Sequence, residues 1–422
     1  MLGLAATTAV GAVACAGTGA GPAPTGSGAI DLRPVDGGPN YYARFPNSLP
    51  DDPSYFPIGV WFESVMSQSD VSIDKRAGLN LYVALTAVSS LPLISASGMK
   101  VIAQHEDWLK RADARGSEAI AGWLLSDEID MQQSNAEGAA QARQQLTNIR
   151  NGLPQDGRAR YTNYGKGVTF WNTDAQAARY VNRFQDVVSA DNYWFTDNNI
   201  CSQWEGGALL TESTRPLTAA ECHRASNYGA TVRRVRQLVS PPGSKPVWAF
   251  VEVGHPFTNA DWPSIAPTEV SAAVWSGIIH GARGVVYFNH SFGGPAPTQH
   301  ALRGRAYAAV RAEVARTNAR IRGLAPVLNA PFADGLVSTT SPIDTMAKYS
   351  GGQFYIFAGS RAPRSQNATF RVPCTGDATV TVVDENRTVF LTGGSFTDSF
   401  ADGNAVHIYR IDGGSTCGLP AP

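Results

Sequence analysis

Residues 246–288 read PVWAFVEVGHPFTNADWPSIAPTEVSAAVWSGIIHGARGVVYF, and this segment sets the fold class. It opens with the apolar run Pro246–Val251 and ends with a second apolar run, Gly284–Phe288. Between them, Thr268–His280 is typical of a helix, because Pro267 and Thr268 favour its start and Gly281 favours its end. Two apolar strands joined by one helix predict a βαβ unit of a parallel sheet.

The same alternation of apolar runs with amphipathic or Ala-rich stretches extends back to Tyr55. It predicts six more strands, at residues 56–62, 79–85, 100–104, 120–125, 159–163 and 186–190, of which 159–163 has the weakest pattern. Further helices are expected at Ser134–Leu153, Ala219–Val239 and Gln299–Leu324. Eight βα units predict a closed (β/α)8 barrel of the TIM type, which we place at residues 31–328.

After Pro331 the pattern changes to short alternating strands separated by Gly, Asp and Asn. The strands expected there are Phe354–Phe357, Ala368–Val372, Ala378–Val383, Thr388–Leu391 and Ala405–Ile411. This pattern predicts a small antiparallel β-sandwich over residues 329–422. A disulfide between Cys374 and Cys417 would tie its last strand back to the module.

Composition restricts the classes of partner. The chain has 422 residues, 43% hydrophobic and 16% charged, so it can bury a full-size core. Its formal net charge is -1 without a long run of either sign, which excludes the broad basic surface that nucleic acid or an anionic membrane needs. We therefore expect a neutral partner and a monomeric protein.

The five cysteines and the N-terminus bear on location. Cys201 and Cys222 bracket a polar segment, so two local disulfides are expected with the C-terminal pair, the alternative being five reduced thiols. Residues 1–14 are apolar but too few to span a bilayer, and with Cys15 they resemble the end of a bacterial lipoprotein signal. That resemblance implies a lipidated Cys15, a signal and linker over residues 1–30, and a secreted or cell-envelope protein. Two features depart from it, Ala12 in place of the usual Leu and the missing basic start, so ordinary cleavage is the alternative.

The strand ends carry the candidate chemistry, because active sites of such barrels lie at the carboxyl ends of the strands. Glu128 follows the apolar run at 120–125, and Glu252 ends the run at 246–251. These two strands face each other across the barrel mouth. A retaining glycosidase needs a protonated acid and an ionised nucleophile about 5 to 5.5 Å apart. The architecture can therefore place the two carboxyls as that chemistry requires.

A Glu after the fourth strand and a Glu after the seventh resemble the signature of clan A glycoside hydrolases, which include family 5. The resemblance covers roughly Tyr55–Leu324 and implies that Glu128 is the acid/base, that Glu252 is the nucleophile and that Tyr193 binds the nucleophile. Two features depart from the clan: Asp127 stands where Asn is usual, and Phe288-Asn289-His290 replaces a usual Trp. An Asp there adds a negative charge that would raise the pKa of Glu128.

Other residues at the strand ends are expected to bind substrate, although an isolated Trp or His is about as often a packing residue. Aromatic faces would stack on sugar rings, histidines would bind hydroxyl or carboxylate groups, and the remaining polar side chains would contribute hydrogen bonds. The substrate-binding candidates are Trp61, Glu63, His105, Asp127, Asn192, Tyr193, Trp194, His255, Asn289 and His290, with Trp108 and Trp204 as further aromatic surfaces. Rival carboxylates are Glu63, Glu106, Asp107, Asp130 and Asp191.

Together these features predict a retaining hydrolase of a polysaccharide or oligosaccharide. No cofactor is expected, and no metal site, because the spacing of a metal motif such as H-E-x-x-H is missing from the sequence. An envelope location would favour a cell-wall furanoside, a galactofuranoside or an arabinofuranoside. The alternatives are an inactive carbohydrate-binding barrel, and a lyase or transglycosylase that uses the same carboxylates.

Overall fold

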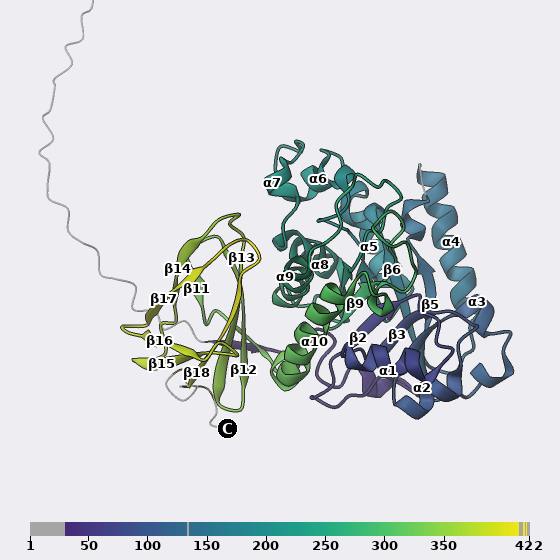
Figure 1. Cartoon of the computed structure of the whole chain (residues 1–422), viewed down its shortest axis with the longest axis horizontal. Helices are drawn as coiled ribbons and strands as arrows, with labels where there is room; N and C mark the ends of the chain where they lie inside the picture. Colours follow the sequence, from purple (N-terminus) through teal and green to yellow (C-terminus); the bar gives the residue numbers. More distant parts are fainter. Residues whose placement is uncertain (1–29, 133–134, 413–416, 418, 420–422) are drawn as a thin grey trace, which may run out of the picture.

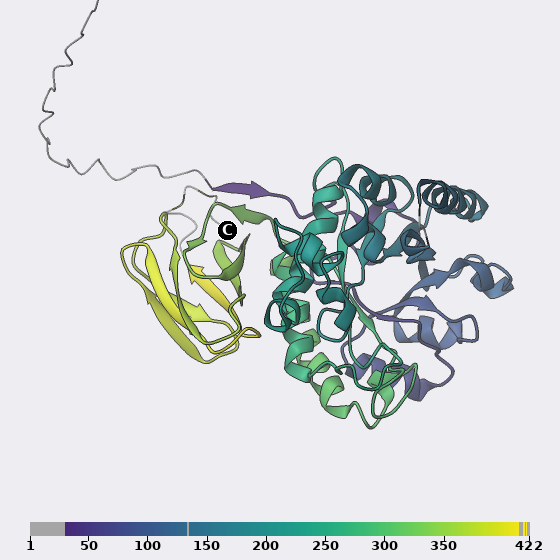
Figure 2. The same ribbon diagram turned by 90° about the horizontal axis from the view of Figure 1, so that it is seen from above.

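The computed structural model describes residues 30–132 and 135–412, together with 417 and 419. The predicted signal segment and the lipidation of Cys15 lie outside the described residues. The chain forms a barrel and a smaller β module that lie side by side in both views (Figures 1 and 2). None of the described helices combines the length and the apolar character that a membrane crossing requires.

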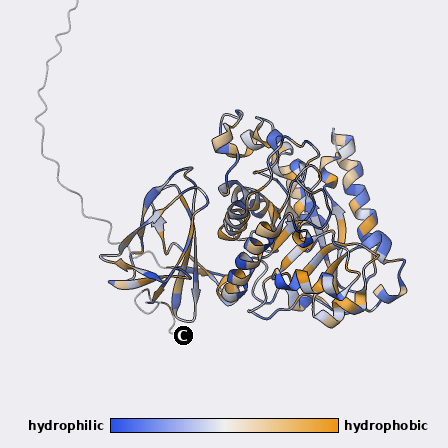
Figure 3. Ribbon diagram, in the orientation of Figure 1, coloured by the Kyte–Doolittle hydropathy of each residue, from blue (hydrophilic) through white to orange (hydrophobic). Residues whose placement is uncertain are grey.

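The barrel is closed by eight parallel strands, as the apolar runs predict. In order around it they are β2 (Ile58–Trp61), β3 (Leu81–Leu85), β4 (Lys100–Gln104), β5 (Ile120–Asp127), β6 (Ala159–Tyr164), β7 (Val187–Ala190), β8 (Val247–Glu252) and β9 (Val285–Phe288). All eight expected strands are confirmed, including the weakly patterned one at β6. Figure 3 shows hydrophobic residues along these strands and many hydrophilic ones along an outer helix.

Helices surround the barrel. The α-helices are α1 (Gln68–Arg76), α2 (Leu91–Ser97), α3 (His105–Trp108), α4 (Ala136–Gly152), α5 (Asp174–Arg183), α6 (Gly206–Leu210), α7 (Ala219–Cys222), α8 (Ser226–Leu238), α9 (Pro267–Ile279) and α10 (Ala308–Leu328). Short 3-10 turns are η1 (Tyr42–Arg44), η2 (Ala112–Ala114), η3 (Ile129–Met131), η5 (Asn198–Cys201) and η6 (Ala301–Arg303), and η4 (Gly167–Trp171) is a π-helix.

Two of the expected helices differ in extent. The helix expected over residues 219–239 is two helices, because His223 leaves the helical region at φ -85° and ψ 76° after the short helix α7. The helix expected from Gln299 begins at Ala308, because Gly304 is extended at φ -73° and ψ 147° and ends the turn η6 first. Both breaks come from backbone conformations that helical periodicity does not reveal.

Barrel side chains alternate between two apolar layers. One set fills the lumen and the other packs under the helices. The lumen set includes Trp61, Leu81, Val83, Ile102, Tyr161, Val187, Trp248, Phe250 and Val286. This filled core leaves the upper end of the lumen, at the carboxyl ends of the strands, as the place for a site.

The C-terminal module is the predicted antiparallel β-sandwich. Its strands are β10 (Phe332–Asp334), β11 (Ser338–Thr339), β12 (Ile343–Ser350), β13 (Gln353–Ser360), β14 (Gln366–Arg371), β15 (Ala378–Val382), β16 (Arg387–Leu391), β17 (Ser395–Phe400) and β18 (Val406–Asp412). Together with β1 (Asp31–Arg33), they form a seven-stranded sheet, in the order β1-β10-β12-β13-β18-β15-β16, and a three-stranded sheet, β11-β14-β17. The module packs on α9, where Trp275 stacks on Phe357.

The first strand of the larger sheet comes from the start of the described chain. β1 (Asp31–Arg33) pairs antiparallel with β10, and Arg33 forms an ion pair with Asp334 at 2.6 Å. Residues 31–33, which we expected with the barrel, therefore extend the sheet of the C-terminal module. The reason is edge pairing, because β10 would otherwise present unpaired backbone groups on that side.

Both expected disulfides form, Cys201–Cys222 and Cys374–Cys417. The second closes a loop with a sequence separation of 43 residues. We expect Cys374→Ser to lower the free energy of unfolding of the C-terminal module by about 4 kcal/mol, because the open chain gains loop entropy when unfolded. Urea denaturation of the full chain, followed by far-ultraviolet circular dichroism, measures this, with tryptophan fluorescence reporting the barrel because all nine tryptophans precede residue 276. An unchanged unfolding curve for the module would contradict it.

Candidate functional site

A cavity of about 350 Å³ lies at the carboxyl ends of the barrel strands. Aromatic side chains form much of its wall, and acidic side chains cluster on one side of it. Its lining residues are Trp61, Asp127, Glu128, Met131, Lys166, Asp191, Asn192, Tyr193, Asp197, Phe250, Pro256, Phe257 and Phe288. Four of the predicted substrate-binding residues, Trp61, Asp127, Asn192 and Tyr193, are therefore brought together with Glu128.

The backbone at the end of β5 is unusual. Glu128 has φ 47° and ψ 27°, a left-handed conformation that non-glycine residues seldom adopt. Its N–H donates to the carbonyl of Asn163 at 3.0 Å, which ties the turn to the neighbouring strand β6. Such a conformation costs roughly 1 to 3 kcal/mol and is found mostly at functional sites. Here it starts the turn η3 at a residue that lines the cavity.

Glu128 and Asp191 form a carboxyl pair inside the cavity. The charge of Asp191, followed by burial, raises the pKa of Glu128 to about 9. The two side chains share a hydrogen bond, which requires a proton on one of them. Tyr193 donates to Asp191 Oδ2 at 2.8 Å, whereas Asp191 Oδ1 has no other donor. A proton held by Glu128 and donated to Asp191 satisfies both groups.

Asp127 adds a third carboxyl to this pair. Enclosure within the cavity, followed by the charge of Asp191, raises the pKa of Asp127 to about 7. Its surface is open to the cavity, and Asn163 Nδ2 donates to its Oδ1 at 3.0 Å. Asn163 is itself positioned by Ser189, whose hydroxyl donates to Asn163 Oδ1 at 2.6 Å. Buried polar side chains beneath the cavity thus orient its carboxylates.

Glu252 occupies the end of β8 on the lumen side. It pairs in register with Phe288, which lines the cavity, and Phe250, two residues earlier on the same face, also lines it. Glu252 itself is fully buried and does not reach the cavity wall in this structure. Its Oε1 accepts hydrogen bonds from Tyr228 at 2.7 Å and Thr196 at 3.0 Å, whereas Oε2 has no partner. Burial raises the pKa of Glu252 to about 7.

Glu63 and Asn289 lie in a buried polar network beside the cavity. Asn289 donates to Glu63, His300 Nδ1 donates to it at 2.5 Å, and Arg303 lies 3.1 Å away. Arg303 continues the network to Asp74 at 2.5 Å. These contacts join β2 to the segment between β9 and α10, and neither Glu63 nor Asn289 lines the cavity.

The predicted histidines also lie outside the cavity wall. His105 Nδ1 donates to the carbonyl of Leu124 at 2.9 Å. His255 is buried, donates through Nε2 to the carbonyl of Asn259 at 2.9 Å and contacts Ser264 at 3.1 Å, so it shapes the loop after β8. His290 is buried among aromatic rings, and burial lowers its pKa to about 4.

Among the predicted tryptophans, only Trp61 lines the cavity. Trp194 and Trp108 are fully buried, and their indole N–H groups donate to Thr231 at 3.0 Å and to the carbonyl of Leu85 at 2.6 Å. Trp204 is 69% exposed on the segment that follows β7. Trp194 and Trp108 therefore pack between elements and offer no open face for a sugar.

Lys166 is a cavity residue that the sequence analysis missed. Its ammonium lies 2.7 Å from Asp197 and 2.6 Å from Glu205, so it joins the segment after β6 to the segment after β7. A signal was available, since Lys166 lies just beyond the predicted strand at 159–163. That strand had the weakest pattern of the eight, which left its end, and therefore the residues that follow it, poorly defined. The aromatic residues Phe250, Phe257 and Phe288 were likewise not proposed.

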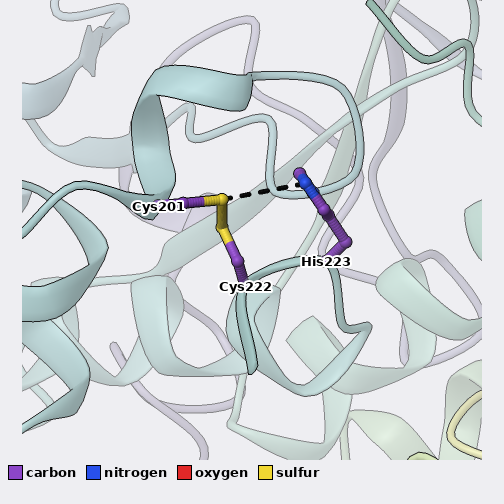
Figure 4. A group of neighbouring side chains, drawn as sticks. All are labelled: Cys201, Cys222 and His223. Carbon is purple, nitrogen blue, oxygen red and sulfur yellow. Dashed lines mark hydrogen bonds between the residues drawn. A yellow bond between two sulfur atoms is a disulfide. The ribbon is translucent and has the colours of Figure 1, made fainter. Parts of the chain in front are cut away.

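The segment between β7 and α8 is pinned by the Cys201–Cys222 disulfide (Figure 4). His223 lies beside it, with Nε2 3.7 Å from Cys201 Sγ and Nδ1 donating to the carbonyl of Trp194 at 2.6 Å. Within the described residues, this trio is the one group of three ligand-type side chains whose donor atoms lie within 4.8 Å of each other. Because its two sulfurs are bonded to each other, it offers no thiolates to a metal.

The fold of this chain is similar to that of solved structures. Neither protein-family models nor curated proteins match this chain. A solved structure described as a glycoside hydrolase is similar over 92% of this chain and 98% of its own, with a TM-score of 0.53 and 11% identity. A family 5 glycoside hydrolase from Bacteroides vulgatus is similar over 92% and 94%, with a TM-score of 0.53 and 12% identity. The chain therefore has the fold of these glycoside hydrolases, a barrel with an additional β module.

Proposed function

We propose that this chain is a retaining glycoside hydrolase with Glu128 as its acid/base and Glu252 as its nucleophile. The observation that carries the proposal is the pairing of Glu128 with Asp191 inside the cavity at the strand ends. Because the pKa of Glu128 is raised to about 9, its carboxyl keeps a proton at neutral pH. A protonated carboxyl in an aromatic cavity is what a glycosidic oxygen needs in order to leave.

Asp191 is too close to Glu128 to be the nucleophile. Carboxyls that act in double displacement stand about 5 to 5.5 Å apart, with the anomeric carbon between them. The charge of Asp191 is the largest cause of the raised pKa of Glu128, so the two carboxyls are coupled as a proton-sharing pair rather than separated by a sugar. The role of Asp191 in the proposal is to hold the proton on Glu128 and to orient its carboxyl.

Glu252 has features that suit a nucleophile. It extends from β8, across the barrel from β5, and Tyr228 and Thr196 anchor one oxygen while the other is free. Two hydroxyl donors to Oε1 favour the ionised form that attack requires. Since Oε2 is covered in this structure, the proposal includes a side-chain rearrangement that uncovers it when the sugar binds.

The reaction then has two steps. Glu252 Oε2 attacks the anomeric carbon, the glycosidic bond breaks, and the proton of Glu128 passes to the departing oxygen. In the second step, Glu128 takes a proton from water, the resulting oxygen attacks the same carbon, and Glu252 is released as a carboxylate. Two inversions return the starting configuration, and Glu128 regains its proton.

Release of 4-nitrophenol from a panel of nitrophenyl glycosides tests the activity. The panel contains pyranosides of both anomeric forms and, because of the expected envelope location, galactofuranosides and arabinofuranosides. Hydrolysis of any member with retained configuration, shown by proton NMR of the first product, supports the proposal. An inverted product would contradict the double displacement. Unsaturated sugars would indicate a lyase, longer chains a transglycosylase, and binding without turnover an inactive barrel.

The pH dependence follows from the pairing of Glu128 with Asp191. The acid must be protonated, so activity should be present below the pKa of Glu128 and be lost as pH rises through it. Asp191→Asn removes the largest influence that raises this pKa. We expect the alkaline limb of kcat/KM to move down by at least about one pH unit in this variant.

Asp127→Asn provides a graded comparison for that experiment. The charge of Asp127 contributes less to the raised pKa of Glu128 than the charge of Asp191 does. The alkaline limb of kcat/KM should therefore move less in Asp127→Asn than in Asp191→Asn. The measurement is kcat/KM as a function of pH for the wild type and both variants. An alkaline limb at the same pH in all three proteins would contradict the proposed role of Asp191.

We infer export on separate grounds. Two disulfides are formed, and structural disulfides persist mainly in secreted and envelope proteins. With the lipoprotein-like segment around Cys15, this supports a secreted or envelope location for the proposed hydrolase. Metabolic labelling of cells with a palmitate analogue, comparing the wild type with Cys15→Ala, tests the lipid anchor.

A further inference from the structure

The cavity wall holds more negative charge than its one basic side chain can balance. Lys166 is the single Lys or Arg among the lining residues, and two carboxylates, Asp197 and Glu205, already share its ammonium. Within the described part of the chain, Asp127 and Asp191 have no Lys, Arg or His within ion-pair distance. Their side-chain donors are neutral: Asn163 for Asp127, and Tyr193, Asn163 and the Glu128 carboxyl for Asp191. Negative charge therefore remains at the place where a sugar would bind.

Two polar residues of the wall have hydrogen-bonding capacity that the described part of the protein does not use. Asn192 is 2% exposed and lines the cavity, yet its Nδ2 has no hydrogen-bond partner among the described residues. Asp127 is open to the cavity, and its bond from Asn163 reaches only Oδ1. Buried polar groups in folded proteins normally have partners, and the unpaired donor of Asn192 is buried in the wall beside the place where a sugar would bind.

Aromatic rings line the same cavity as these carboxylates. Trp61, Tyr193, Phe257 and Phe288 line the cavity, and Tyr193 lies 5.1 Å from Phe288 and 6.1 Å from Phe257, ring centre to ring centre. Aromatic faces attract organic cations through the negative potential above the ring, and they also stack on sugar rings. An ammonium group carried on a sugar ring is recognised by carboxylates that lack a basic partner, together with neighbouring aromatic rings.

We propose that the sugar bound in this cavity carries a protonated amino group, and that the substrate is a glycan of hexosamine units with free amines. This inference rests on the proposed glycoside hydrolase function. The ammonium would lie against Asp127, which is open to the cavity, with Asp191 as the nearby second charge. An N-acetylated sugar lacks the positive charge, and a uronic acid would bring a further negative charge to the acidic wall.

Calorimetric titration of the full chain measures the preference. The ligands are glucosamine and galactosamine, their N-acetyl forms, and glucose and galactose, each at low and at high sodium chloride. We expect the amino sugars to bind about tenfold more tightly than their neutral counterparts, with a preference that shrinks as salt increases. Asp127→Asn should remove most of this preference. Asp107→Asn is the matched control, because its carboxylate pairs with Lys110 on the surface, and it should leave the preference unchanged.

The possible results of this titration either support or overturn the proposed preference for amino sugars. Equal affinity for amino and neutral sugars would overturn it, as would a preference that survives in both Asp127→Asn and Asp191→Asn. Circular dichroism of each variant shows whether it is folded, and the salt dependence of the wild type supplies a reading that needs no variant. Equal hydrolysis of nitrophenyl glycosides of glucosamine and of glucose, added to the panel for this purpose, would refute this inference alone. Tight amine binding without hydrolysis of any glycan would support it and refute the proposed activity.

Discussion

Glu252→Ala is expected to lower kcat/KM by about 10⁴-fold or more, because it removes the atom that would form the bond to the anomeric carbon. Sodium azide should restore part of the activity by entering the space that the carboxylate leaves. Because azide would then attack once, the product should be a glycosyl azide of inverted configuration. Steady-state kinetics on the best member of the nitrophenyl panel, with NMR of the azide product, provides the measurement.

Two further variants make that result specific. Glu252→Gln keeps the size of the buried side chain and should be equally inactive, which separates loss of the nucleophile from loss of packing. Glu137→Ala, on the exposed side of α4, should retain wild-type activity. Activity in Glu252→Ala above about a tenth of wild type would remove Glu252 from the mechanism.

Glu128→Ala is expected to lower kcat/KM by about 10² to 10⁴-fold on substrates with poor leaving groups. The loss should be much smaller on dinitrophenyl glycosides, because their leaving group departs without a proton. Azide should accelerate the second step of this variant and give a glycosyl azide of retained configuration. A Brønsted plot of kcat/KM against leaving-group pKa, for the wild type and the variant, measures the effect.

The control for Glu128→Ala is another acidic residue near the strand ends. Glu106 follows β4 and has a side chain that is 75% exposed, so Glu106→Ala should match the wild type across all leaving groups. An equal loss on good and poor leaving groups in Glu128→Ala would contradict a general-acid role. It would instead indicate that Glu128 contributes to binding or to the position of Asp191.

The turn at Glu128 and the buried position of Glu252 show where sequence reasoning ends. Both residues could be named from the sequence because each follows an apolar strand, and strand ends of a barrel meet at one edge. Whether a carboxyl faces the cavity depends on backbone angles and on the loops above it. Thr196 and Tyr228 belong to the segment after β7 and to α8, and no local pattern predicts that they cover Glu252.

Several residues were predicted to bind substrate because they follow a barrel strand, but they lie outside the cavity wall. Glu63 and Asn289 follow barrel strands but bind each other, His300 and Arg303. Trp194 follows β7 but packs under Thr231 of α8. A strand end can be identified from periodicity, whereas the side toward which a loop residue turns is set by partners distant in the chain.

The sequence by itself determined the eight strands, the barrel and the antiparallel module. The reason is that the spacing of apolar residues along a segment fixes which side chains must be buried, and therefore whether the segment forms a strand or a helix. Local cysteine spacing likewise predicted both disulfides, and the structure confirms them. Only the tertiary structure decided that Glu128 meets Asp191, that Lys166 bridges two loops and that Glu252 is covered. These contacts join segments far apart in the chain, and their geometry follows from strand register and loop packing, which no single segment encodes.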